Sequence, residues 1–505
     1  MKVAAHMQFY RELVDDDPHR RNERQRPECA DNGDLYMLRP GPRKLRILLD
    51  DDSLDGPENQ HHKMFDALLG YQGVEPTTVS MKKISEPPPM GSPNPRNEVL
   101  VLDTTKSKGT FSYPGPAFGY RVFDSDGDLR SAGNLSPGVQ LEQSYFARLY
   151  PDAPREAPTL PKADEDRAVL LAEIARAVHA DIVVSETSAI GDPKLYAYHR
   201  ANTFSRAQCI PLIAHYLRIQ HIYVTDPRRH RTINRRGFYQ ESVAALAPRI
   251  WHWLAKCQNA SMFLPHATAY LDECRAMIGR LLRALKVKDE LIYYLGSYQN
   301  HEVMDDAADC MDRILVSLCG AVDIMARSVH NALQVPGNNF NAKLHNTDWY
   351  TKKFRPTYER ASGIDVLDDM QAMLSVVFEL RNTIHSLALE AMGSIGPTVN
   401  FFQQDRGRLN VLIPERSAAT MRKTTGGLES WGARQVGSDV VADAATMIET
   451  CLEVVFSFLD QLCAIISFEQ IWDKDQVLQQ NVISAEAMLK PDALEVVRVL
   501  LGANE

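Results

Sequence analysis

Long segments in which apolar residues recur every three or four positions dominate the second half of the chain. Five of them follow one another after about residue 240, at 242–257, 267–287, 304–335, 366–393 and 439–468. This spacing is that of an amphipathic helix, whose apolar stripe must be buried against other helices. Gly-, Pro- and Asn-rich stretches separate the segments, and no repeat of fixed length argues for a solenoid. We therefore predict an all-α bundle of five to seven helices over residues 241–505.

The first half of the chain has a different sequence pattern, with short apolar runs between Pro- and Gly-rich stretches. Two runs, 44–50 and 97–103, each carry four or five apolar residues and end on Asp. A third run, 180–186, has a similar pattern and follows the helical stretch 165–179. Short buried strands that alternate with helices are typical of an α/β domain with a partly parallel sheet. We predict such a domain over residues 44–240, with Pro-rich inserts, after an N-terminal extension over residues 1–43.

Charge and hydropathy exclude several classes of protein. The 505 residues carry a formal charge of −9, so no overall basic field draws the chain to nucleic acid or to an anionic membrane. The most apolar segment, 451–468, is interrupted by Glu453 and Asp460, which favours a buried helix over a membrane span. The eight cysteines form no CxxC pair, and the first thirty residues contain no apolar stretch. We predict a cytoplasmic protein with no membrane partner.

A polar cluster ends the fourth helical segment, in the order Arg381, Asn382, Thr383, Ile384 and His385. The apolar stripe of that segment runs through Met370, Leu374, Val377 and Phe378. Arg381 follows Val377 by four positions and precedes His385 by four, so both polar groups lie on or beside the core-facing stripe. The pair is either a partnered Arg with a core His, or an Arg/His site for phosphate. In the second case Arg offers a bidentate fork and His can move a proton at a ribose hydroxyl.

A helical bundle in which one helix ends with this cluster resembles the HEPN superfamily, whose hallmark is an Arg, often followed by Asn, with a His four to seven positions after the Arg. The resemblance covers roughly residues 250–470. It implies a metal-independent ribonuclease without a cofactor, of the kind found in toxin and antiviral defence systems. By the same resemblance Arg381 and Asn382 would hold the scissile phosphate, and His385 would act as general base or acid. RNA as substrate, a homodimer whose subunits share the active site, and a regulatory partner are also implied.

Two further patterns in this half could line the same cleft. Arg327 and His330 are three positions apart on one predicted helix, either as a second pair or as a solvated edge of the bundle. The stretch 338–355 interleaves cations with aromatic residues, a combination that suits single-stranded RNA. Its candidate RNA-binding residues are Lys343, His345, Trp349, Lys352, Lys353 and Arg355. An ordinary helix–helix loop anchored by aromatic residues is the alternative.

Acidic residues accompany the predicted strands of the first half. Carboxylates that meet at the carboxyl ends of parallel strands can hold Mg²⁺ or Mn²⁺. The runs 47–53 and 179–186 resemble the first and a late strand of PIN-like nuclease domains. On that resemblance the metal ligands would be drawn from Asp50, Asp52, Asp103, Asp181 and Glu186. The alternative is an α/β domain in which these residues cap turns and helices.

Several hypotheses about the function remain open at this point. No Rossmann GxGxxG and no P-loop motif is present, which argues against a nucleotide site of either kind. The densest basic run, 226–236, is either a phosphate-contacting patch or a solvated linker. We expect a ribonuclease that acts through Arg381 and His385. The alternatives are a non-catalytic sensor of nucleic acid or another ligand, or a metal-dependent nuclease or hydrolase that uses the carboxylates of the first half.

Overall fold

The computed structural model of the chain describes residues 44–54, 59–80, 97–103, 118–123, 128–135, parts of 171–187, 203–264, 267–295, 301–333, 337–384, 391–392, 409–466 and 491–503. The chain forms two compact units that divide between Arg231 and Thr232. We call them the α/β unit and the helical unit. Among the described residues, no helix is both long enough and apolar enough to cross a membrane.

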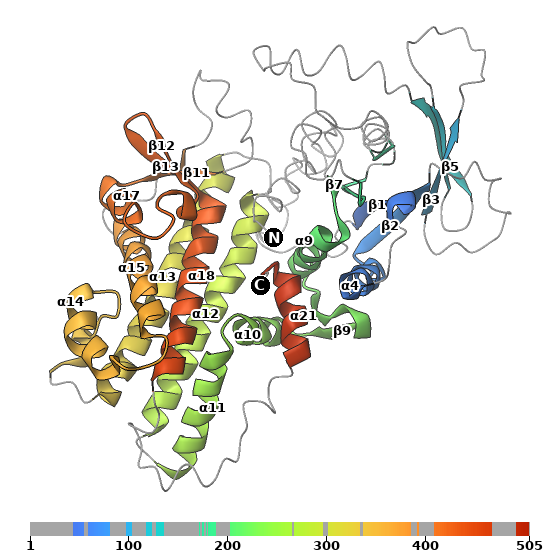
Figure 1. Ribbon diagram of the computed structural model, residues 1–505. Helices are drawn as coiled ribbons and strands as arrows, with labels where there is room; N and C mark the ends of the chain where they lie inside the picture. The colour runs from blue at the N-terminus through green and yellow to red at the C-terminus, as the bar shows by residue number, and fades with distance from the viewer. Residues whose placement is uncertain are drawn as a thin grey trace. The chain divides into compact units, whose positions relative to one another are not determined.

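A seven-stranded sheet organises the α/β unit, in the order β5-β4-β3-β2-β1-β6-β7 (Figure 1). Five strands are parallel: β1 (Leu45–Asp50), β2 (Val74–Ser80), β3 (Asn97–Asp103), β6 (Ile182–Val184) and β7 (Thr203–Phe204). Two antiparallel strands extend the edge beyond β3: β4 (Phe118–Phe123) and β5 (Leu129–Leu135). The described helices of this unit include α3 (Asp51–Leu54), α4 (Gln60–Leu69) and α9 (Arg206–Ile219).

The predicted strands 44–50, 97–103 and 180–186 coincide with β1, β3 and β6, which confirms a partly parallel α/β layout. β1 is almost wholly buried because it lies between β2 and β6 at the middle of the sheet. From β1 the chain builds outward to β2 and β3 on one side, and to β6 and β7 on the other. The carboxyl ends of β1 and β6 therefore flank the topological switch point, where open α/β sheets bind ligands.

Among the residues that the structure describes, the helical unit has seven helices of eleven residues or more, and the predicted segment 242–257 covers parts of two of them. They are α10 (Arg235–Leu246), α11 (Pro248–Phe263), α12 (Ala267–Leu295), α13 (His301–Ala332), α15 (Ile364–Thr383), α18 (Ala444–Ile465) and α21 (Pro491–Leu501). α12 and α13 lie side by side along most of their length, and α18 packs against α11, α13 and α15 (Figure 1). Short turns connect α13 to α15: η2 (Asn339–Asn341), α14 (Thr347–Trp349), η3 (Tyr350–Phe354) and η4 (Arg355–Tyr358).

The prediction that this half is all-helical is wrong in one respect, because the unit also contains a four-stranded sheet. Its order is β10 (Ala391–Met392), β11 (Asn410–Ile413), β13 (Asp439–Asp443) and β12 (Ala433–Val436), all antiparallel. Two short helical elements, α17 (Glu415–Met421) and η5 (Glu429–Trp431), lie between its strands in sequence. The fifth predicted helix starts late, at Ala444, because Asp443 caps it by accepting a 2.9 Å hydrogen bond from the Thr446 N–H.

A candidate anion-binding site in the helical unit

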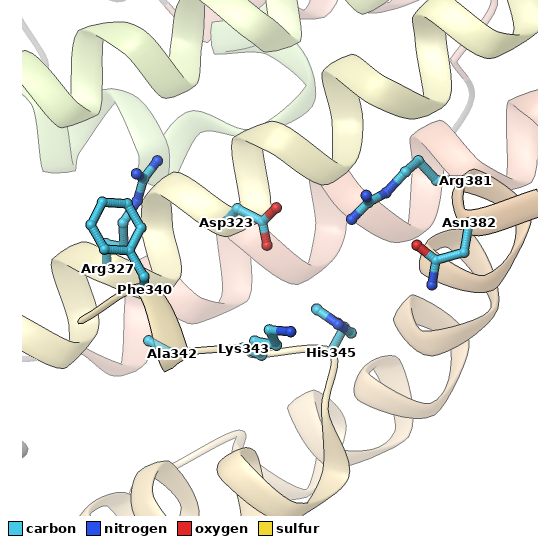
Figure 2. A pocket seen from close by; sticks show the side chains of 8 residues that line it. All are labelled: Asp323, Arg327, Phe340, Ala342, Lys343, His345, Arg381 and Asn382. Carbon is cyan, nitrogen blue, oxygen red and sulfur yellow. The ribbon is translucent and has the colours of Figure 1, made fainter. Parts of the chain in front are cut away.

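A pocket of about 380 Å³ opens between α13, α15 and the loop that connects them (Figure 2). Its lining comes from three places in the sequence: Asp323, Arg327, Phe340, Ala342, Lys343, His345, Arg381 and Asn382. In Figure 2, Arg327 and Phe340 lie at one end, Arg381 and Asn382 at the other, and Asp323 between them. Basic, aromatic and imidazole groups thus meet in one hollow of the helical unit.

Arg381 reaches this pocket because the buried stripe of α15 leads to it. Leu374, Val377 and Phe378 are buried, and Arg381 continues the stripe one turn later as a half-buried residue. Its guanidinium carbon lies 5.6 Å from the centre of the Phe378 ring, a cation–π contact. The Arg381 Nε is buried and has no hydrogen-bond partner in the described part of the chain. A buried donor that lacks a partner is costly, so this group is prepared for an acceptor.

Positive charge outweighs negative charge around the pocket. Arg327, Lys343 and Arg381 line it with a single carboxylate, Asp323. Burial raises the pKa of Asp323, whereas the charges of Arg381, Arg327, Lys343 and Arg280 act in the opposite direction. Among the residues that the structure describes, none of the three lining cations has an acidic oxygen within 4 Å. The arrangement favours an anion such as phosphate.

Arg280 contributes to this field from α12 because a glycine makes room for it. Gly320 lies one turn before Asp323 on α13, and a Cβ there would clash with the Arg280 Nη1. The bare backbone therefore lets the guanidinium of Arg280 lie across α13. Arg280 is outside the pocket lining, yet its charge reaches Asp323.

His345 supplies a neutral imidazole beside these cations. Its ring stacks on Phe378 with centroids 3.6 Å apart and planes 13° from parallel, and its backbone oxygen accepts a 2.9 Å hydrogen bond from Gln371 Nε2. Burial lowers the pKa of His345 to about 4, and the charges of Lys343 and Arg381 act in the same direction. Its Nδ1 is buried without a partner in the described chain. At neutral pH the ring is therefore uncharged, and it is a weaker base than an ordinary histidine.

Burial also keeps the nearest thiol in its protonated form. Cys319 is buried on α13, which raises its pKa to about 12, although the charge and hydrogen bonding of Arg381 oppose the shift. A protonated thiol is a poor nucleophile. Cys319 therefore contacts Arg381 but is not expected to react.

The structure brings some of the residues singled out from the sequence together and separates others. Arg381 and Asn382 share the pocket with Arg327, Lys343 and His345. His385 lies outside the described residues. The pocket residues that sequence reasoning missed are Asp323, Phe340 and Ala342.

The other loop and helix candidates have roles outside the pocket lining. His330 is buried and stacks on Trp349, with centroids 6.5 Å apart. Lys352 pairs with Asp348 at 3.1 Å. Lys353 is exposed, and Arg355 pairs with Asp368 at 2.8 Å and with Asp365 at 3.4 Å.

In the α/β unit, the carboxyl ends of β1 and β6 carry a hydrogen-bonded polar cluster. Ser185 Oγ donates a 2.6 Å hydrogen bond to Asp50 Oδ2, and both residues are fully buried. Ser53 Oγ lies 3.1 Å from Ser185 Oγ and accepts from the Glu186 N–H at 3.0 Å. Asp52 Oδ1 accepts a 2.8 Å hydrogen bond from Ser80 Oγ at the end of β2. The cluster ties three neighbouring strand ends together.

The carboxylates of two predicted metal ligands, Asp181 and Glu186, are bonded elsewhere. Asp181 precedes β6, at the opposite edge of the sheet from Asp50, and accepts a 2.9 Å hydrogen bond from the Arg46 N–H. The carboxylate of Glu186 is held at the start of α9, where the Arg206 N–H and Nε donate to it at 3.0 and 3.3 Å. Asp103 ends β3, and its side chain is not described. Among the described side chains, no group of three or more His, Cys, Asp or Glu is placed to hold a metal ion.

Asp226 partly neutralises the beginning of the basic run 226–236. Arg228 Nε lies 3.2 Å from Asp226 Oδ1, and Arg229 Nε lies 3.6 Å from Asp226 Oδ2. Both guanidinium groups are thus in ion pairs at the end of β8 (Tyr223–Asp226). These pairs weaken the argument for a phosphate-contacting patch at this point.

Comparison with known proteins gives no match: no protein-family model, no curated protein and no solved structure matches the chain. The function is therefore argued from the chemistry of the pocket.

Proposed function

We propose that the protein is a metal-independent ribonuclease whose active site is the pocket around Arg381. The observation that carries the proposal is the buried, unpartnered Nε of Arg381 beside the neutral ring of His345, in a pocket with three cations and one carboxylate. An anion with several acceptor oxygens would supply a partner for the Arg381 Nε. A neighbouring group that releases a proton would supply a partner for the His345 ring. A phosphodiester next to a ribose 2′-hydroxyl has this chemistry.

Arg381 and Asn382 would bind the scissile phosphate. The guanidinium can donate two parallel hydrogen bonds to phosphate oxygens, and Asn382, exposed on the next residue of α15, adds an amide donor. Lys343 would stabilise the additional negative charge that develops as the 2′-oxygen attacks phosphorus. The bond to the 5′-oxygen then breaks, and the 3′ end is left as a cyclic phosphate.

A histidine would move the proton. His345 would accept the proton of the 2′-hydroxyl. Burial is the main reason why its pKa is low, and the negative charge of a bound phosphate would raise the pKa by offsetting the charges of Lys343 and Arg381. His385, four residues after Arg381, remains the second candidate, as general base or as the acid that protonates the 5′-oxygen. The test below separates the two histidines.

The wider assignments rest on the resemblance described above and stand as part of the proposal. The helical unit would be HEPN-like and the α/β unit PIN-like, and the protein would act on RNA in the cytoplasm as a homodimer in a toxin or defence system, with a regulatory partner. The strand order around β1 is compatible with a PIN-like unit. The observed positions of Asp181 and Glu186 favour a structural role for that unit over a metal-dependent reaction.

Cleavage of a labelled single-stranded RNA by the full chain, in excess EDTA, tests the proposal. We expect cleavage that yields a cyclic phosphate and that stops when the 2′-hydroxyl at the cleaved position is replaced by hydrogen. Arg381→Ala should abolish it, and Asn382→Ala should weaken it. Loss with His345→Asn but not with His385→Ala assigns the base to the pocket loop, and the opposite pattern assigns it to the residue after α15. Arg275→Ala, at an exposed position on α12, is the matched control and should cleave normally.

Two outcomes would replace the proposal with one of its alternatives. Protein that binds RNA through Arg381 but never cleaves it would be a non-catalytic sensor. Cleavage that EDTA abolishes, and that is lost in Asp50→Asn but kept in Arg381→Ala, would move the activity to the strand ends of the α/β unit.

A further inference from the structure

We propose that Phe340, backed by Arg327, is a stacking platform for one unpaired nucleobase, so that the pocket accepts single-stranded RNA and rejects duplex RNA. The inference rests on the proposed function, because it names the substrate class of the same site. It assigns a role to the end of the pocket that the phosphate chemistry leaves unused.

Phe340 is unusual because it lines a pocket and is nevertheless exposed. The side chain is 69% exposed, the largest fraction among the large apolar side chains that the structure records as exposed. Arg327 places its guanidinium carbon 5.5 Å from the centre of the ring. The cation covers part of one face, and the high exposure leaves aromatic surface free for a ligand. Exposed aromatic faces beside cations are the usual means of binding unpaired bases.

The turn that carries Phe340 is held in place by its neighbours. Asn338 Oδ1 accepts a 3.0 Å hydrogen bond from the Phe340 N–H at the start of η2, and Asn339 Nδ2 donates to Asn331 Oδ1 of α13 at 3.4 Å. Ala342 and Leu344, which follow the turn, are buried. The ring therefore stands on an anchored segment, so stacking a base on it costs little ordering of the chain.

The position of the ring relative to the cations matches the layout of a nucleotide. Figure 2 shows Phe340 and Arg327 at one end of the pocket and Arg381 at the other, with Lys343 and His345 along the side between them. A phosphate at Arg381 leaves the Phe340 end for the base of a neighbouring nucleotide. In an RNA duplex the bases are stacked and paired inside the helix, so only an unpaired base can offer its face to the ring.

Binding of uncleavable RNA tests the platform apart from catalysis. The probe is a single-stranded oligonucleotide with 2′-O-methyl groups throughout, compared with its duplex and with versions that lack one base at successive positions. Phe340→Ala should weaken binding of the single strand by about fivefold or more, and Phe340→Trp should preserve it. Removing one particular base should weaken binding to the native chain equally, and Phe340→Ala should then cause no further loss. Tyr293→Ala, at an exposed aromatic position on α12, is the control and should bind normally.

Competition by inorganic phosphate reports on the cationic end alone. Phe340→Ala should leave this competition unchanged, whereas a variant with a collapsed pocket would lose it. The inference is overturned if Phe340→Ala binds the single strand as tightly as the native chain, or if the duplex binds as tightly as the single strand. Native protein that prefers the single strand through Phe340 yet never cleaves natural RNA overturns the proposed function and leaves the platform standing. RNA cleavage that does not depend on Phe340 and accepts duplexes overturns the platform alone.

Discussion

The imidazole of His345 stacks on the ring of Phe378 with centroids 3.6 Å apart. Phe378 is 1% exposed, so this contact joins the loop between α13 and α15 to the core of the bundle. The same ring carries the guanidinium of Arg381 at 5.6 Å. Phe378 thus contacts both polar groups on which the proposed reaction depends. The burial of His345 beside it keeps the imidazole uncharged at neutral pH.

The lowered pKa of His345 predicts a specific loss of stability in acid. The pKa falls from 6.5 to about 4 in the folded protein. Because the folded state takes up the proton less readily than the unfolded state, the full stability is present above pH 6.5 and declines as the pH falls toward 4. The loss is at most about 3 kcal/mol. Chemical unfolding across this pH range should show a smaller decline for His345→Asn than for the native chain. Parallel curves would mean that His345 is protonated normally.

Arg381 should be important for activity and unimportant for folding. Arg381→Ala removes a buried Nε–H that has no partner and reduces repulsion among the pocket cations. These gains offset the lost contacts with Phe378 and Cys319, so the melting temperature should change little. Cleavage should fall by about a hundredfold or more, as for loss of a donor to a developing oxyanion. Arg381→Lys should not restore the rate, because an ammonium lacks the planar fork of a guanidinium. A large fall in melting temperature in either variant would make Arg381 a structural residue.

Asp323 should weaken anion binding in the native protein. It is the one carboxylate that lines the pocket, and burial raises its pKa. Asp323→Asn keeps the shape and removes the charge, so RNA should bind more tightly and with a steeper dependence on salt. The free energy of unfolding should fall, because Arg327, Lys343 and Arg381 lose their compensating charge. Binding isotherms at two salt concentrations check the first expectation, and unchanged affinity would show that Asp323 is protonated in the native chain.

Elements could be predicted from the sequence where a local apolar pattern alone determines the structure. Runs of buried residues identified β1, β3 and β6, and the apolar stripe of α15 pointed to Arg381. β2 was missed because Pro76 and Glu75 interrupt its apolar pattern, although its register with β1 is regular. The strand β13 was included in a helix because Val440 and Val441 also fit the helical period of the segment that follows.

The missed parts of the site depend on contacts between distant segments. On α13, Asp323 is one of many polar positions in the sequence. Only the packing of α15 and the loop adds Arg381 and Lys343 to Arg327, which follows Asp323 on the same helix. From the sequence, Phe340 is expected to anchor a loop in the core, whereas in the fold its side chain is exposed.

The hydrogen bond between Ser185 and Asp50 should stabilise the α/β unit. Ser185→Ala removes the 2.6 Å donor from a fully buried carboxylate, which should lower the free energy of unfolding by about 1–3 kcal/mol. Ser185→Thr keeps the hydroxyl and should recover much of the loss. Urea unfolding followed by circular dichroism measures both variants. RNA cleavage by the helical unit should persist in Ser185→Ala as long as the protein is folded, and its selective loss would implicate the strand ends in the reaction.

Gly320 and Gly279 offer a matched test of the part that Arg280 plays. Both are interior helical glycines, so alanine at either position should raise stability by about 0.5–1 kcal/mol through helix propensity. At Gly279 nothing lies within 4 Å of the added Cβ, whereas at Gly320 the Cβ displaces the flexible end of Arg280. Moving that guanidinium away weakens the positive field at Asp323. Gly320→Ala should therefore bind inorganic phosphate and RNA more weakly than Gly279→Ala while remaining fully folded. Equal affinities in the two variants would show that Arg280 contributes nothing to the pocket, and a loss of stability in Gly320→Ala alone would show that Arg280 is fixed rather than flexible.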